Sequence, residues 1–178
     1  METPPLVLRA LALAEAQGFA KSCRPEDGAL LHILAARRGT ARAAEIGTGL
    51  GVGAAWIVSA LPPQVPFFTA ELDPVLAARA AELFADDPNV TVIAGSWRDS
   101  LPEEAPFDLV FVDASDAKDD VDAVLGLLAP GGTVVLGDFW HDPVLPDARR
   151  DAWLRHPALS AIELWVTPVR RALVAVRR

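Results

Sequence analysis

Four glycines stand at alternate positions within the stretch AEIGTGLGVGAAW, which covers residues 44 to 56. They are Gly47, Gly49, Gly51 and Gly53. A glycine inside regular structure costs roughly 0.5 to 1 kcal/mol relative to alanine, so this cluster needs a compensating reason. Linkers are polar, whereas this stretch runs directly into the apolar residues 54 to 58, so we set a flexible linker aside. The pattern indicates a loop whose bare backbone lies against a ligand.

Polar or glycine-containing turns follow five apolar segments along the chain. A single acid in such a place often caps a helix or faces water, but five successive examples indicate a shared site. The carboxyl ends of parallel strands meet at one edge of a sheet, and ligands bind in the crevice beyond that edge. The five turns contain Glu45 with the glycines, Glu71 with Asp73, Gly95 to Trp97, Asp113, and Asp138.

Two classes of cofactor compete for the glycine loop. A dinucleotide fold favours the pattern G-x-G-x-x-G, which fails when it is started at Gly47, because the sixth position is Val52. Started at Gly49, the pattern reaches Ala54 and fits the relaxed form. Glu45 stands two residues before the first glycine, where its carboxylate would repel a pyrophosphate and attract a ligand that carries an ammonium and a sulfonium. We therefore favour the cationic ligand, with a nicotinamide cofactor as the alternative.

The periodicity of apolar residues predicts the elements that position these turns. Helices are expected at 5–20 and 25–37, and a helix at 147–156 precedes two closing strands at 161–168 and 169–178. Between them, strands at 41–46, 65–72, 90–95, 107–114 and 133–138 alternate with helices at 52–60, 74–84 and 121–132. Strands that are apolar throughout need cover on both faces. The pattern predicts an α/β fold: a Rossmann-like, doubly wound, mostly parallel sheet of seven strands with a C-terminal antiparallel hairpin and helices on both faces.

Length and composition narrow the function classes. The chain has 178 residues, which suits one domain: N-terminal helices at 1–40, a cofactor-binding core at 41–140, and a helix with the hairpin at 141–178. The net charge of -8 argues against nucleic-acid binding, which depends on clustered cations. No apolar run approaches the roughly 20 residues of a membrane span, and METPP does not resemble a signal peptide. A cytoplasmic protein without a membrane partner is expected.

The segments AAEIGTGLGVGAAWI, FFTAELDP, VTVIAGSWRDSLP, FDLVFVDA and LLAPGGTVVLGD resemble, in order and spacing, the class I S-adenosylmethionine (SAM)-dependent methyltransferases. The resemblance is strongest to the small O-methyltransferases related to the catechol and caffeoyl-coenzyme A enzymes, whose lead-in resembles RPEDGALLHIL. It implies methyl transfer from SAM to a small-molecule acceptor, with oxygen favoured, and a homodimer. A non-catalytic module that binds SAM or S-adenosylhomocysteine (SAH) is the alternative, and an NAD(P)-dependent oxidoreductase is less favoured.

The resemblance also implies roles for individual residues. The Glu45 side chain and the loop backbone would lie along the methionine part of SAM, and Glu71 would accept hydrogen bonds from both ribose hydroxyls. Leu72 would contact one face of the adenine, and Ser96 and Trp97 would border its edge, with a core position for Trp97 equally favoured. Asp113 would lie near the methionine amino group at the reaction centre. The implied cofactor-binding set is completed by the loop residues Gly47, Thr48, Gly49, Gly51 and Gly53.

Departures from the family pattern argue against a metal site. In metal-dependent members a lysine stands three residues after the acid that ends the fourth strand, and the fifth strand ends in Asp-Asn; these acids and the amide hold magnesium. Here the corresponding positions hold Asp116 and Phe139. Asp113 and Asp138 alone would leave a hard cation with few protein ligands, so no metal is expected. Lys118 is interpreted as a solvated charge at a helix start, although it could substitute for the missing residues of the metal site if the loops shift.

Three residues form the candidate catalytic set: Asp113, Asp138 and His141. His141 could take a proton from an acceptor hydroxyl near neutral pH, although a structural role is favoured on general grounds. With Asp142, it could also substitute for the lost metal ligands. The segment after Asp138 is shorter than the acceptor-covering insertion of the family. We therefore expect an acceptor pocket that is open or is completed by a second subunit.

Overall fold

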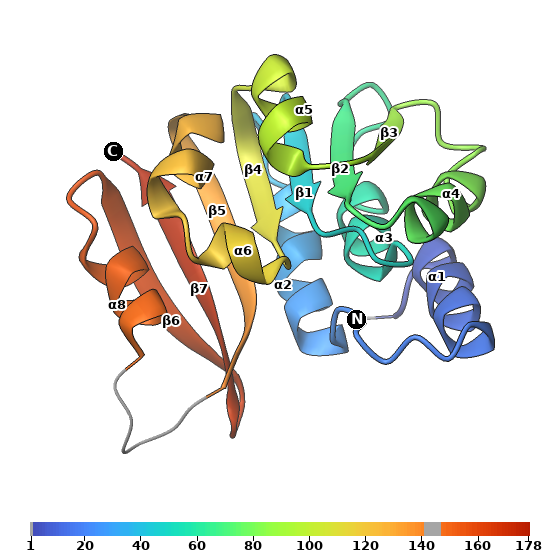
Figure 1. The fold of residues 1–178 in the computed structure, drawn as a ribbon, viewed down its shortest axis with the longest axis horizontal. Coiled ribbons are helices and arrows are strands. Elements are labelled where there is room, and N and C mark those ends of the chain that lie inside the picture. The colour runs from blue at the N-terminus through green and yellow to red at the C-terminus, as the bar shows by residue number, and fades with distance from the viewer. Residues whose placement is uncertain (1, 141–146) are drawn as a thin grey trace.

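The structure, a computed structural model, describes residues 2–140 and 147–178, and its centre is one seven-stranded sheet (Figure 1). The strands lie in the order β3-β2-β1-β4-β5-β7-β6. β1 to β5 are parallel to one another, whereas β7 is antiparallel to both β5 and β6. The predicted fold class, with its C-terminal antiparallel hairpin, is therefore confirmed. The strand bounds are β1 Ala43–Ile46, β2 Phe67–Glu71, β3 Val90–Ala94, β4 Phe107–Val112, β5 Leu128–Trp140, β6 Leu159–Thr167 and β7 Arg170–Arg177.

Helices flank the sheet on both faces. Figure 1 shows α5, α6, α7 and α8 in front of the sheet, with α2 and α3 behind it. Within the described part of the chain, no helix combines the length and apolar character needed to cross a membrane. The helix bounds are α1 Pro5–Ala16, α2 Pro25–Ala35, α3 Val52–Val58, α4 Pro74–Leu83, α5 Trp97–Glu104, α6 Ser115–Lys118, α7 Val121–Leu127 and α8 Ala148–Arg155.

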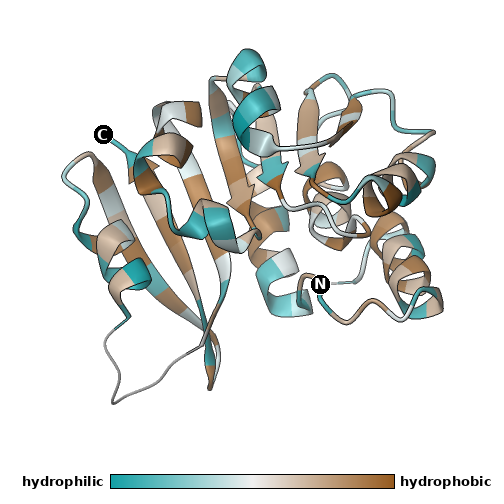
Figure 2. Cartoon of the chain, viewed as in Figure 1, coloured by the Kyte–Doolittle hydropathy of each residue, from teal (hydrophilic) through white to brown (hydrophobic). Residues whose placement is uncertain are grey.

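The side chains of β4 alternate between two hydrophobic cores. Leu109 and Phe111 pack in the core that includes α1, α2 and α3, while Val110 and Val112 pack in the core that includes α5, α7 and α8. This period of two follows from the pleat of a strand. Because both faces are covered, the strand is apolar along its length, as Figure 2 shows for the central strands. The acid at this end of the sheet, Asp113, consequently follows the last apolar residue of the strand.

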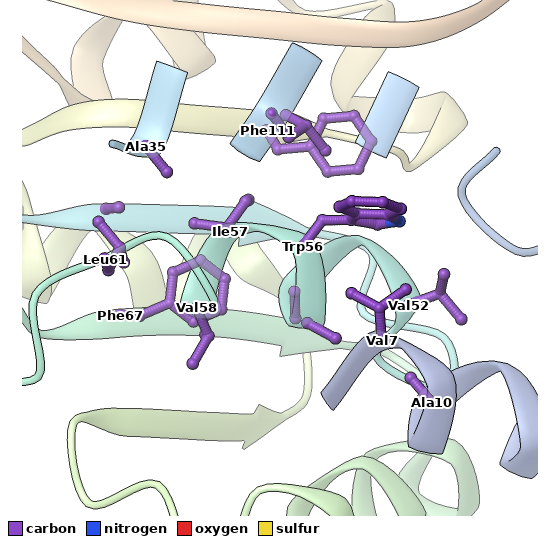
Figure 3. Packing of buried hydrophobic residues seen from close by; sticks show 14 of the residues in the cluster. Val7, Ala10, Ala35, Val52, Trp56, Ile57, Val58, Leu61, Phe67 and Phe111 are labelled. Atoms are coloured by element: carbon purple, nitrogen blue, oxygen red, sulfur yellow. The ribbon is translucent and has the colours of Figure 1, made fainter. Parts of the chain in front are cut away.

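Trp56 of α3 packs in the core that includes α1, α2 and α3, which we call the first core (Figure 3). It is 4% exposed and shares a cluster with Phe111 of β4 and Val7 of α1. Gly28 lets α2 approach this ring closely, because a Cβ atom there would lie 2.2 Å from the indole nitrogen of Trp56. The close packing of α2 on α3 fixes the first turn of α2 beside the strand ends.

Several elements differ from the sequence prediction, among them the short helix α6, which was not predicted. The helix expected over 121–132 ends at Leu127, and Leu128 to Gly132 already belong to β5. The helix α5 follows β3 directly and was not predicted. Its sequence, WRDSLPEE, contains Pro102 and too few apolar residues to show helical periodicity, although Ser96 caps its first turn.

Candidate cofactor and acceptor site

A cavity of about 390 Å³ lies beyond the carboxyl ends of β1 to β4. This volume is typical of small-molecule sites. The lining includes segments from the loops after four different strands, as the sequence predicted for a shared crevice. It contains every predicted cofactor-binding residue except Gly51: Glu45, Gly47, Thr48, Gly49, Gly53, Glu71, Leu72, Ser96, Trp97 and Asp113.

The glycine loop turns sharply between β1 and α3. Gly47 has a φ of 94°, which other residues adopt only with strain, and a Cβ atom there would lie 3.0 Å from the backbone nitrogen of Ala114. Gly51 does not line the cavity, so its predicted contact with the cofactor has no support in this geometry. It is the N-cap of α3 with a φ of 83°, and a Cβ atom there would lie 2.9 Å from the Phe84 ring. The fold itself therefore requires a glycine at that position.

Glu71 ends β2 with its carboxylate fixed by the backbone. Its Oε2 atom accepts a hydrogen bond of 2.7 Å from the Gly49 N–H, and its Oε1 atom accepts one of 3.0 Å from the Asp73 N–H. Asp73 in turn caps α4 by accepting a hydrogen bond from the Val75 N–H at 2.8 Å. A carboxylate has room for about four such contacts. Two therefore remain for donors in the cavity, which suits a pair of ribose hydroxyls.

Glu45 is 1% exposed and supports the glycine loop from behind. The Thr69 hydroxyl donates to it at 2.7 Å, and that hydroxyl lies 2.5 Å from the Thr48 hydroxyl. Burial raises the pKa of Glu45 well above its usual range. Hydrogen bonds from Thr69 and from the Ala54 N–H favour its charged form. Glu45 thus lines the cavity as predicted, but it also ties β1 to β2 and to the start of α3.

The part of the first cavity that lies after β2 and β3 combines apolar and aromatic groups. Leu72 is 76% exposed beside it. The Trp97 indole N–H donates to Asp116 Oδ2 at 2.9 Å, and the guanidinium of Arg98 lies 4.4 Å from the indole centre. Trp97 is 6% exposed, so it belongs to the core and lines the cavity at once. Asp116, which was not predicted as a site residue, lines the same end and fixes the ring.

A second cavity of about 440 Å³ adjoins the first. The segment before α2 borders both cavities through Lys21, Ser22 and Cys23, and Asp113 also lines both. Asp113 therefore lies at the junction of the two spaces. The second cavity is completed by residues from α2, α6 and the ends of β5 and β7.

Lys118 is buried in the second cavity, so its interpretation as a solvated charge was wrong. It is 8% exposed, its Nζ atom donates to the Gly137 carbonyl at 2.8 Å, and it lies 3.8 Å from Asp113 Oδ1. Burial lowers the pKa of Lys118, although Asp113 and Asp138 oppose the change. The indole N–H of Trp153 holds the Lys118 carbonyl at 2.9 Å. This contact comes from α8, so nothing near Lys118 in sequence signals it.

Two carboxylates of the second cavity have altered acidity. Burial raises the pKa of Asp113 to about 6, with Lys118 lowering it and Asp138 raising it. Burial likewise raises the pKa of Asp27 to about 6, and Asp113 and Asp138 raise it further. The sequence analysis missed Asp27, because an acid in the first turn of a helix is ordinarily explained by the helix dipole.

Asp138 lies at the rim of the second cavity with a φ of 62°, which is unusual for a residue other than glycine. It forms an ion pair with Arg170, and Arg24 lies 3.9 Å away. His141 and Asp142, the other residues considered after β5, lie outside the described residues. Among residues 2–140 and 147–178, no group of three or more His, Cys, Asp or Glu side chains is placed to hold a metal ion.

The raised carboxylate pKa values predict how stability changes with pH. A folded state with a pKa of about 6 binds protons more tightly than an unfolded chain near 3.8, so stability is greatest at low pH and falls as pH rises through about 6. We expect the free energy of unfolding to be about 2 kcal/mol lower at pH 7.5 than at pH 5, with contributions from Asp27 and Asp113 and with the buried Glu45 acting in the same direction. Urea unfolding at both pH values measures this, and a free energy that rises over the interval would contradict it.

Comparison with known proteins identifies the family. Residues 44–139 match a family model described as a methyltransferase domain. A Mycobacterium ulcerans protein, assigned by name to the O-methyltransferases, is 34% identical over 157 residues, covering 81% of this chain and 70% of its own length. The O-methyltransferase TomG of Streptomyces achromogenes, solved with SAM, is 27% identical with a TM-score of 0.80, covering 99% of this chain and 91% of that one.

The same fold recurs in an O-methyltransferase from Bacillus cereus solved with SAH, at 22% identity and a TM-score of 0.83, covering 100% of this chain and 93% of that one. The predicted preference for SAM over a nicotinamide cofactor is confirmed by these relatives. The family model, the mycobacterial relative and the cavity at the strand ends all agree. The chain belongs to the methyltransferase-domain family and is a class I SAM-dependent O-methyltransferase.

Proposed function

We propose that the chain transfers the methyl group of SAM to a hydroxyl oxygen of a small molecule held in the second cavity, without a divalent cation. The observation that carries this proposal is the position of Asp113, which lines both cavities. A donor in the first cavity and an acceptor in the second would meet beside its carboxylate. Holding two reactants in this way supplies much of the acceleration in a displacement reaction.

The residues of the first cavity suit the separate parts of SAM. When bound, SAM supplies a methyl group on a positively charged sulfur, which becomes neutral on transfer. Glu71 would receive the ribose hydroxyls on the carboxylate positions that Gly49 and Asp73 leave free. The exposed side chain of Leu72 would cover the adenine, and the Asp113 carboxylate would attract the cationic end.

The carboxylates that could hold magnesium already face protein cations. Lys118 lies 3.8 Å from Asp113, and Arg170 and Arg24 lie beside Asp138. Phe139, at the position where metal-dependent relatives have an amide, is 5% exposed and packs in the second core. A hard cation needs several oxygen ligands that are free to approach it. This donor set therefore does not fit magnesium.

Removal of divalent cations is expected to leave activity unchanged. We expect dialysis against EDTA, followed by an assay with or without added magnesium, to change the methylation rate by less than about twofold, because protein cations balance Asp113 and Asp138. Release of SAH, measured by mass spectrometry, reports the rate. A loss of more than about tenfold that magnesium restores would contradict metal independence.

The proposed reaction is tested by incubating the protein with SAM labelled in the methyl group and a panel of phenols and carboxylic acids. Transfer of label to a hydroxyl oxygen, identified by mass spectrometry of the product, is the expected result. The competing function is a non-catalytic module. Calorimetric binding of SAH without labelled product from any acceptor in the panel would favour that module, and failure to bind SAH would remove both.

Four further parts of the proposal concern the chain as a whole. We infer that residues 1–178 act as one domain, supported by the continuous sheet that joins the cofactor-binding core to the C-terminal hairpin. We also propose a homodimer, on the family resemblance, and a cytoplasmic location, on the composition; light scattering tests the first and cell fractionation the second. The net charge of -8 supports a small-molecule acceptor over a nucleic acid.

A further inference from the structure

Asp27 is a buried carboxylate that the fold itself does not use. It lies on the face of α2 that also carries Leu31 and Ala35, which pack in the first core. Asp27 is 4% exposed, and its Oδ1 atom has no hydrogen-bond partner in the described structure. A buried polar atom without a partner is costly, and such atoms in native proteins need an explanation. An unsatisfied carboxylate on an apolar helix face indicates a role in binding or reaction.

Asp27 lies in the second cavity, which we propose holds the acceptor. Asp27 lines that cavity together with Asp113 and Lys118. A Cβ atom built on Gly137 would lie 3.6 Å from the Asp27 carboxyl carbon, and the carbonyl of the same glycine accepts from Lys118 Nζ at 2.8 Å. The strand end at Gly137 thus brings a carboxylate and an ammonium to one small space. Asp113 lines both cavities and therefore lies on the side of the first cavity, from which SAM would deliver its methyl group.

We propose that Asp27 binds the acceptor hydroxyl and takes its proton during methyl transfer; this inference rests on the function proposed above. The acceptor O–H bond breaks, and its hydrogen passes to the Asp27 carboxylate as a proton. The oxygen electron pair forms the new bond to the methyl carbon, and the electron pair of the broken carbon–sulfur bond stays on sulfur. The proton is afterwards released to solvent, which returns Asp27 to its charged form.

The charges around Asp27 fit this role. Glu26 on the same helix and Asp113 and Asp138 on neighbouring elements raise the pKa of Asp27, while Lys118 lowers it. Burial makes the largest contribution, and the resulting pKa of about 6 leaves the carboxylate charged at neutral pH but more basic than a surface aspartate. General bases work best when their pKa is near the operating pH. A phenolic hydroxyl has a pKa of about 10, which is closer to the pKa of Asp27 than the pKa of an aliphatic alcohol is.

Binding of a hydroxyl probe tests the contact without any turnover. The probe is 4-fluorophenol, titrated into the SAH-saturated protein and followed by ¹⁹F NMR. We expect Asp27→Asn to weaken its binding by about tenfold or more, while fluorobenzene, which lacks the hydroxyl, binds both proteins alike. Glu26→Gln is the matched control, because it removes the same charge from an exposed neighbouring residue. Circular dichroism and an unchanged SAH affinity establish that Asp27→Asn is folded.

The rate measurement separates proton transfer from binding. At pH 8 and saturating acceptor, Asp27→Asn is expected to slow methylation of 4-fluorophenol by about 100-fold or more, as for loss of a general base. Pentafluorophenol is already ionised at this pH, so its methylation should fall by less than about tenfold. The wild-type rate with 4-fluorophenol should rise with pH through about 6, and this rise should be absent from the variant.

The outcomes distinguish this inference from the function on which it rests. Equal binding of 4-fluorophenol to the wild type and Asp27→Asn, or equal slowing with both phenols, would overturn the role of Asp27 and leave the methyltransferase assignment intact. Failure of the wild type to bind 4-fluorophenol while it binds SAH would overturn the role too. Failure to bind SAH would instead remove the proposed function itself.

Discussion

Glu71→Ala is expected to weaken SAH binding by about 100-fold. The side chain offers two carboxylate positions toward the cavity, and each hydrogen bond between a hydroxyl and a charged group contributes roughly 1.5 to 3 kcal/mol. At the lower end of this range, loss of both corresponds to about two powers of ten in the dissociation constant. Removal of the carboxylate also frees the Gly49 N–H and the Asp73 N–H, which it orders in the wild type. Isothermal titration calorimetry with SAH measures the effect directly.

Asp86→Ala is the matched control for Glu71→Ala. Asp86 is an exposed acid in the turn after α4, so its loss changes the net charge by the same amount without touching the cavity. SAH affinity should then stay within about twofold of the wild type. An equal loss of affinity in both variants would mean that overall charge, and not the carboxylate at the end of β2, controls binding.

Gly53→Ala is expected to destabilise the fold by about 3 kcal/mol. A Cβ atom at this position would lie 2.3 Å from Glu45 Oε1 and 2.9 Å from the Phe111 ring, and both neighbours are 1% exposed. Phe111 packs in the hydrophobic core and Glu45 is held by the Thr69 hydroxyl, so neither moves without loss of contacts, and overpacking of this kind typically costs 1 to 3 kcal/mol or more. For a chain of this size the melting temperature should fall by roughly 6 to 12 °C, as measured by differential scanning calorimetry.

Gly126→Ala is the control for Gly53→Ala, and we expect it to change the melting temperature in the opposite direction. Gly126 lies in α7, and a Cβ atom there would meet no atom within 4 Å. Alanine favours a helix over glycine by roughly 0.5 to 1 kcal/mol, so this variant should melt slightly higher than the wild type. If Gly53→Ala melted as high as Gly126→Ala, the packing of Glu45 against the start of α3 would not be a constraint on the sequence.

The cofactor half of the site could be predicted from the sequence because its signals are local. Each acid stands directly after an apolar strand, and parallel topology brings such strand ends together. Glu71 is the last residue of β2, Asp113 directly follows β4, and both line the first cavity. The cofactor role of Gly51, which the family resemblance implied, stays a prediction, because this glycine lies beside the Phe84 ring and does not line the first cavity.

The acceptor half was harder to predict, because its features depend on contacts distant in sequence. The burial of Lys118 requires the Gly137 carbonyl and the ring of Trp153, which lie 19 and 35 residues away. Asp27 belongs to a helix whose first turn carries two acids, so one of them resembles an ordinary dipole partner. Only the packing of α2 on the sheet reveals that this acid faces inward. Burial of a charged group is a property of the assembled fold.

The two cavities are lined in part by different segments of the chain, so mutations could change one cavity without changing the other. Every residue that lines the first cavity precedes position 117, whereas the second cavity also takes Lys118, Gly137, Asp138 and Arg170. With the acceptor in the second cavity, as proposed above, mutations in the region from Lys118 onward should alter which acceptor fits while SAM affinity is preserved. A directed-evolution library confined to that region would search new acceptors without repeatedly losing the methyl donor.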